Sequence, residues 1–365
     1  MDEATSRRRV LGAVGLALLA WVPLLLLRLA FPRSGPEPTI TFFEDLSVHV
    51  RFLLVVPILV LADALIAART GMTMAAFELS GLIPDEQRGR FQEMRARTVR
   101  LGNSAVAQAV LAGVVALVIG TSIRSQASHG VRWFQEQDAG GGIHLSIPGW
   151  WYVAASVMLA YLFGRHLWRY GLWCWLLFRT SRFDLRLVGT HPDRAGGLGF
   201  VNVGHAAFSS VPLAASCVLA SRAATDVLQL GVPLRTFQLP LLSFAVLSLA
   251  VGLLPFPIFV RGLARTKRAG LVRYGKLATR YVQDFEHKWL EEGAAADETL
   301  LGTGDIQSLA DIGGSYERLA TMKVTPIDRR TLIAFVVASV LPLLPLALTV
   351  MPLDEIVKVL LRAVV

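Results

Sequence analysis

Long uninterrupted apolar runs are the feature that most constrains how this chain can fold. Runs of about 20 residues recur along it, and a helix of that length, rising 1.5 Å per residue, crosses the hydrocarbon core of a bilayer. A helix also satisfies its backbone hydrogen bonds internally, which lipid requires. The composition, 54% hydrophobic and 17% charged, is too apolar for an ordinary soluble domain. The sequence therefore predicts an all-α, polytopic helical membrane protein with about seven transmembrane helices.

The apolar runs divide the chain into three parts. The predicted spans are residues 10–31, 48–68, 104–123, 149–178, 203–221, 237–260 and 331–350. The first six spans form a transmembrane bundle within residues 1–260, in which residues 69–102 are an amphipathic cytoplasmic segment. Residues 261–330 follow as a cytoplasmic helical hairpin. Residues 331–365 hold the last span and a short interfacial helix on the outer side.

The predicted hairpin rests on helical periodicity after the sixth span. An apolar stripe recurs there at intervals of three and four residues, formed by Leu271, Tyr274, Ala278, Tyr281, Phe285 and Trp289. This helix continues the sixth span into the cytosol, and residues 304–322 supply a second helix that folds back against it.

Basic residues set the expected orientation. If the N-terminus is cytoplasmic, the inside segments hold 27 of the 36 Lys and Arg residues, as the positive-inside rule requires. We therefore expect a cytoplasmic N-terminus and a C-terminus on the outer side. The basic residues beside the bilayer are expected to contact anionic headgroups. No nucleic-acid recognition fold accompanies this charge, so nucleic acid is not an expected partner.

Small residues at four-residue spacing mark the third span. One ladder is Ala105, Ala109 and Gly113, and such ladders allow close approach of helix backbones. The span is therefore predicted to be central and tightly packed, either within one chain or between the copies of a homo-oligomer.

Charged residues interrupt the fourth apolar run. If the helix is continuous there, Arg165 and Arg169 share a face beside His166, and two arginines at that depth need water, an acid or an anion. Asp63 in the second span is the nearest intramembrane acid, so these four residues form a candidate substrate or ion path. In the alternative, the span ends at Trp168 and the arginines extend to the headgroups.

A glycine-rich loop precedes the fifth span. It contains His191, Asp193, Arg194, Gly196, Gly197 and Gly199. Glycines permit positive φ, and exposed amides before a helix can bind an anion that Arg194 would enclose. The alternative is a rigid turn, with Asp193 as a capping residue, that docks under the bundle.

Two segments carry a resemblance to a known group of proteins. The segments HPDRAGGLGF at 191–200 and DIQSLADIGGSYE at 305–317 resemble paired segments of uncharacterised bacterial polytopic inner-membrane proteins of similar length. The resemblance implies a bacterial inner membrane and brings no known activity with it.

Catalytic and cofactor motifs are missing from the sequence: it has no phosphate-binding loop, HExxH motif or nucleophile elbow. Asp184, His191 and Asp193 form the only acid–base grouping at the predicted inner interface, and no metal-ligand spacing connects them. An enzyme is therefore the less favoured class, and we expect no cofactor or metal. The favoured function is a channel or secondary transporter for a small anion or anionic solute. The alternative is a non-transporting scaffold or sensor that docks a cytoplasmic protein through its hairpin.

Overall fold

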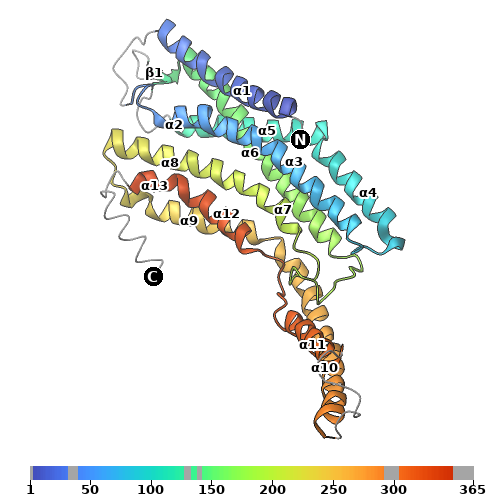
Figure 1. The fold of residues 1–365 in the computed structure, drawn as a ribbon. Coiled ribbons are helices and arrows are strands. Elements are labelled where there is room, and N and C mark those ends of the chain that lie inside the picture. Colours follow the sequence, from blue (N-terminus) through green and yellow to red (C-terminus); the bar gives the residue numbers. More distant parts are fainter. Residues whose placement is uncertain (1–2, 32–39, 127–132, 138–141, 292–303, 348–365) are drawn as a thin grey trace.

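Long helices dominate the computed structural model, which describes residues 3–31, 40–126, 133–137, 142–291 and 304–347 (Figure 1). Within these residues, six helices are long and apolar enough to span a membrane, and the number is seven if one bent helix pair is counted as a single span. The predicted all-α polytopic membrane fold is confirmed.

The bundle and the hairpin contain the following elements. The long helices of the bundle are α1 (Glu3–Ala30), α3 (Val56–Leu79), α4 (Asp85–Gly102), α5 (Ala105–Gln126), α6 (Ile147–Thr180), α8 (Ser210–Leu230), α9 (Arg235–Leu253) and α12 (Arg329–Val340). The helical hairpin consists of α10 (Val260–Glu286) and α11 (Gly304–Ala320). Shorter helices are α2 (Leu46–His49), α7 (Val201–Ala206) and α13 (Leu344–Ala347). The antiparallel strands β1 (Gln135–Gln137) and β2 (Ile143–Leu145) pair with Gln135 opposite Leu145. They lie at the end of the bundle opposite the helical hairpin (Figure 1).

The second span is longer than predicted. It runs as one 34-residue helical segment, Leu46–Leu79, with a π-helical stretch at Val50–Val55. The helix ends at Leu79, and Pro84 is the N-cap residue of α4. The first part of the predicted cytoplasmic segment 69–102 is therefore the end of α3, because Met74 and Phe77 remain buried in the bundle.

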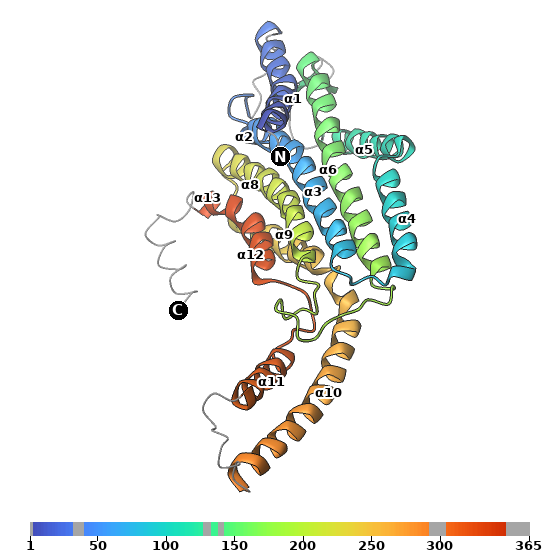
Figure 2. The ribbon, with the colours of Figure 1, turned by 45° about the vertical axis from the view of Figure 1, so that its right-hand side comes forward.

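The third span is bent. Helices α4 and α5 meet at 42°, and together they have the length and composition of a span that is either broken or re-entrant (Figure 2). Ala105, Ala109 and Gly113 lie exposed on α5, and a Cβ added at Gly113 would meet no atom within 4 Å. The prediction of tight packing within one chain is therefore wrong for this ladder. Packing between copies stays a prediction.

Prolines break the last two spans. A 3₁₀ turn at Phe256–Phe259 separates α9 from α10 beside Pro255, within the long segment Arg235–Glu291 that carries the sixth span into the hairpin. A second 3₁₀ turn contains Pro342 in the last span. Proline removes a backbone donor, which explains both breaks. The predicted interfacial helix after residue 350 lies outside the described residues.

The helical hairpin forms as predicted and projects from one end of the bundle (Figures 1 and 2). The Tyr281 hydroxyl on α10 donates to the Asp305 carbonyl at 3.1 Å. Gly270 allows the two helices to approach, since a Cβ there would lie 2.5 Å from Leu319 Cδ2. The stripe that contains Tyr281 is therefore half-buried against α11.

Candidate functional site

The fourth span is continuous through its charged residues. α6 is a single helix of 34 residues, Ile147–Thr180, and Ser146 caps its start by accepting from the Gly149 amide. The helix therefore does not end or bend at Trp168. The placement of the two arginines at membrane depth stays a prediction. Arg165 and Arg169 lie one turn apart on α6, and both contact Asp63 on α3, so they share a face as the four-residue spacing predicts.

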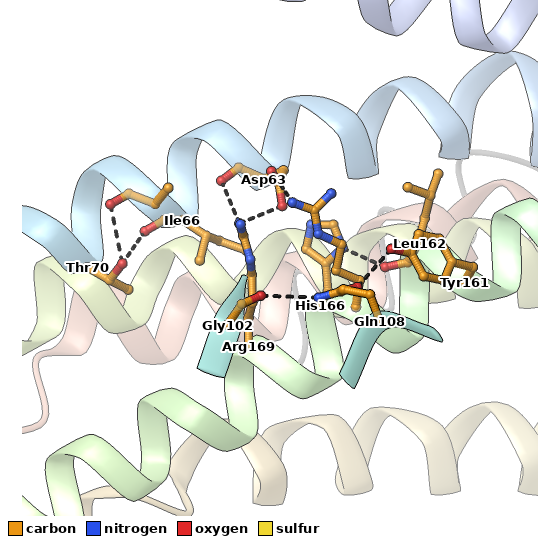
Figure 3. Close-up of polar contacts among 11 residues, drawn as sticks. Asp63, Ile66, Thr70, Gly102, Gln108, Tyr161, Leu162, His166 and Arg169 are labelled. Atoms are coloured by element: carbon orange, nitrogen blue, oxygen red, sulfur yellow. Dashed lines mark hydrogen bonds and ion pairs between the residues drawn. The ribbon is translucent and has the colours of Figure 1, made fainter. Parts of the chain in front are cut away.

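Asp63 pairs with both arginines. Its Oδ1 lies 2.5 Å from Arg169 Nη1, and its Oδ2 lies 3.4 Å from Arg165 Nη2 (Figure 3). Arg169 Nη1 also donates to the Asp63 carbonyl at 3.3 Å. The structure thus brings together three of the four residues that the sequence singled out as a substrate or ion path.

The Asp63 cluster carries an excess of positive charge. Two guanidinium groups share one carboxylate, and the side chains are only partly exposed: 31% for Arg165, 18% for Arg169 and 28% for Asp63. A charge in an apolar setting is costly unless it is paired, so the shared carboxylate reduces that cost. One positive charge remains uncompensated within the cluster and can attract an anion.

His166 is buried beside this cluster, with 1% of its surface exposed. Its Nδ1 lies 2.7 Å from the Leu162 carbonyl, four residues earlier on the same helix. A carbonyl can only accept, so the proton sits on Nδ1 and Nε2 is left as an acceptor. Within the described part of the chain Nε2 has no hydrogen-bond partner.

A pocket of about 330 Å³ adjoins the Asp63 cluster. It lies between α3, α4 and α6, and Arg169 reaches it from α6 while Arg95 reaches it from α4. Most of the remaining wall is apolar, including Met74 and Leu172. This volume lies within the range typical of small-molecule sites.

The glycine-rich loop folds around the carboxylate of Asp193. The Ala195 and Gly197 amides donate to its Oδ1 at 2.8 and 3.1 Å, and the Gly199 amide donates to Oδ2 at 2.8 Å. His191 Nδ1 lies 2.8 Å from Oδ1. The amides considered for a bound anion are thus directed at a carboxylate of the chain itself. An external anion at this loop stays a prediction.

These contacts change the acidity of Asp193. Burial alone raises the pKa of its carboxyl, but the hydrogen bonds from the Ala195, Gly199 and Gly197 amides and from His191 outweigh burial and hold the pKa below its usual range. The carboxylate is therefore ionised at neutral pH and acts as the internal anion of the loop.

The loop also joins the bundle to the hairpin. The exposed Arg194 adopts φ +54°, and its carbonyl accepts from the Lys323 amide at 2.8 Å. Asn202 accepts from the Asp328 amide at 3.0 Å and donates to the Gly199 carbonyl at 3.0 Å. The loop thus docks under the bundle, as the rigid-turn interpretation predicts.

The acid–base grouping considered for catalysis is divided between two contacts. Asp184 accepts from Gln87 Nε2 at 2.7 Å, whereas His191 pairs with Asp193. In the residues that the structure describes, no three His, Cys, Asp or Glu side chains are grouped in a way that could hold a metal ion.

Sequence reasoning missed a buried histidine that ties three helices together. Trp173 Nε1 on α6 donates to His205 Nδ1 on α7 at 3.3 Å, so His205 carries its proton on Nε2 and donates it to the Gly252 carbonyl of α9. The three residues are far apart in the chain, and no local pattern links them.

Comparison with known proteins gives no relative. No family model, no curated protein and no solved structure matches this chain.

Proposed function

We propose that this protein is a channel or secondary transporter for a small anion or anionic solute, with Asp63, Arg165 and Arg169 in the path and His166 beside it. The observation that supports the proposal is the charge excess of a cluster in which Asp63 bridges both arginines and Arg169 also lines a pocket. Ionisable residues at membrane depth typically mark ion or substrate pathways. The pocket gives an anion a place to meet the uncompensated charge.

The proposed setting is a bacterial inner membrane with a cytoplasmic N-terminus and an external C-terminus. The charge distribution of the sequence supports this orientation, because the hairpin and the loop after α6 are rich in basic residues. Figure 1 supports it further, since the hairpin and the loop between α6 and α7 lie at the same end of the bundle. The pocket then lies in the cytoplasmic half.

Flux through reconstituted liposomes tests the proposal. The purified protein is inserted into vesicles, and efflux of chloride, nitrate, phosphate and acetate is followed under an imposed gradient, with potassium as the cation control. We expect flux of at least one of these anions and none of potassium. An Arg165→Gln, Arg169→Gln variant should lose the flux, because it leaves Asp63 as the only charge of the cluster.

Matched variants separate loss of the path from loss of the fold. Arg165→Lys with Arg169→Lys keeps both charges and should retain part of the flux, whereas Arg51→Gln removes an arginine that donates to Tyr152 at the other end of the second span and should leave flux intact. Absence of flux for every anion in both directions would contradict the proposal, as would full flux in the double Gln variant.

The alternative, a scaffold or sensor that docks a cytoplasmic protein through its hairpin, relies on the stripe that contains Tyr274, Tyr281 and Phe285. Those side chains are half-buried on the face of α10 that contacts α11. A partner would have to displace α11 or use the exposed faces of the hairpin, so the alternative receives less support than transport does.

A further inference from the structure

The pocket beside Arg169 has a chemical character of its own. Its apolar wall includes Ile66 and Met74 from α3 and Leu172 and Leu176 from α6, with Phe208 completing it. A small hydrated anion would leave this wall in contact with water. An occupant that covers it needs an apolar part of comparable size.

The polar groups that remain free in the pocket favour a negative charge. The hydroxyls of Thr70 and Thr98 already donate to the Ile66 and Met94 carbonyls at 2.6 and 2.8 Å. Arg169 uses Nη1 for Asp63, and its other guanidinium nitrogens have no partner among the described residues. Free donors on a cation select an acceptor group that is charged, such as phosphate or carboxylate.

Arg95 supplies the second cation from the opposite wall. Its Nη1 contacts Glu78 Oε1 at 3.2 Å, and its side chain is 40% exposed. A neighbouring groove of about 370 Å³ shares Arg95 and Val99 with the pocket and continues toward Glu78 and Gln92. The groove thus adjoins the pocket at Arg95 and Val99.

The pocket opens sideways, between α3 and α4. Ala67, Gly71 and Val99 line it and are themselves exposed. α3, a candidate membrane span, carries Ala67 and Gly71 at this edge, and α4, which meets α5 at 42°, carries Val99. A molecule that lies in the bilayer can therefore enter with its chain along the apolar edge and its head toward the arginines.

We infer that this pocket binds an amphiphilic anion, a phosphate or carboxylate head with an attached alkyl chain, with the head held by Arg95 and Arg169 and the chain along the wall of α3 and α6. Either an anionic phospholipid of the bilayer or a free single-chain amphiphile has this chemistry. Because Arg169 is shared, the inference rests on the proposed function and names its substrate class. It is tested by binding rather than by flux.

Binding of dodecyl phosphate to the full chain in dodecyl maltoside micelles tests the inference, measured by microscale thermophoresis. We expect saturable binding that is at least tenfold weaker in Arg169→Gln and in Arg95→Gln. Inorganic phosphate should bind at least tenfold more weakly than dodecyl phosphate, because it covers none of the apolar wall. Arg88→Gln is the matched control, since Arg88 lies on the same helix and pairs with Asp85 away from the pocket. Its affinity should equal that of the wild type.

Gly71→Leu tests the pocket without changing any charge. Gly71 lines the pocket, and a Cβ there would meet no atom within 4 Å, so a leucine enters open space. Leucine also favours a helix more than glycine does, so the variant should fold. We expect its affinity for dodecyl phosphate to fall at least tenfold. Wild-type affinity in Gly71→Leu, or equal affinity of the wild type for phosphate and dodecyl phosphate, would overturn the inference.

Lipid analysis identifies the source of the amphiphile. Anionic phospholipid that co-purifies with the wild type and is depleted in Gly71→Leu supports the inference with the bilayer as the source. Equal lipid content, with dodecyl phosphate binding lost in Gly71→Leu, supports it with a free amphiphile as the source. If the wild type binds dodecyl phosphate but carries no anion flux in liposomes, only the transport proposal is contradicted. If it carries anion flux but does not bind dodecyl phosphate, only the amphiphile site is contradicted.

Discussion

Arg169 on α6 holds Asp63 on α3 through a single nitrogen, since its Nη1 contacts both the carboxylate and the backbone carbonyl of that residue. The contact joins two of the longest helices in the bundle. Arg165 Nη2 lies 3.4 Å from the second carboxylate oxygen of Asp63. Asp63 is therefore the residue on which the charge balance of the cluster depends.

Removing the charge of Asp63 alone should destabilise the protein more than removing the charges of Asp63 and Arg169 together. We expect Asp63→Asn to lower the free energy of unfolding by about 1–3 kcal/mol, because two partly buried guanidinium groups lose their shared partner. The Asp63→Asn, Arg169→Gln double variant should recover part of that loss. Thermal unfolding in detergent micelles for the two single variants and the double variant gives the coupling energy, for which contacting residues typically show about 0.5–3 kcal/mol. Strictly additive effects would contradict the pairing.

Asp193 should make its loop sensitive to acid. Its pKa in the folded protein lies below the unfolded value of about 3.9. Its stabilising contribution is therefore complete at neutral pH and is lost as the pH falls below about 4 and through the folded pKa. We expect hydrogen exchange at the Ala195, Gly197 and Gly199 amides, corrected for intrinsic rates, to accelerate in that range.

Asp193→Asn should produce the same loss at pH 7. An amide side chain has one acceptor oxygen and no charge, so exchange at the three amides should rise by roughly tenfold, which corresponds to about 1.4 kcal/mol. The amides in the middle of α6 serve as the internal control, because they do not contact the carboxylate. Unchanged protection of Gly199 in the variant would show that the loop does not depend on Asp193.

Local patterns in the sequence predicted the membrane fold and the charge cluster for definable reasons. An apolar run of about 20 residues has few alternatives to a span, and a charge inside one has to be paired. The four-residue spacing of Arg165 and Arg169 then placed both on one face, and Asp63 was the nearest acid.

The pocket could not be predicted in the same way. It depends on α4 lying beside α3 and α6. The buried Phe91 of α4 contacts Phe77 of α3 and the partly buried Phe183, which follows the end of α6, and these residues are far apart in the chain. The small residues of α5 misled for a different reason. Lipid is as apolar as a protein interior, so small residues such as Ala105, Ala109 and Gly113 have the same sequence pattern on a face that meets lipid and on a face that packs against another helix.

Two glycines with nearly the same backbone angle allow the loop contact to be measured separately. Gly196 has φ +65° and Gly231 has φ +64°, but a Cβ at Gly196 would lie 2.9 Å from Leu263 Cδ2, whereas one at Gly231 would meet nothing within 4 Å. Gly231→Ala should therefore lower the free energy of unfolding only by the cost of placing an alanine in the left-handed region, about 1–2 kcal/mol. Gly196→Ala should lose a further 1–3 kcal/mol or so from overpacking against the buried leucine. Equal effects on thermal stability in micelles would contradict the close contact between loop and hairpin.

Gly270 should control whether the hairpin stays closed. A Cβ there would lie 2.5 Å from Leu319 Cδ2, and Leu319 is only 1% exposed, so its side chain has little room to move away. We expect Gly270→Val to separate α11 from α10 and to speed tryptic cleavage after Arg273 and Lys276 by about tenfold. Ala269→Val is the control, because Ala269 is the adjacent residue on an exposed face. If both variants are cleaved at the wild-type rate, α11 does not protect α10, and the stripe that contains Tyr281 is available to a partner after all.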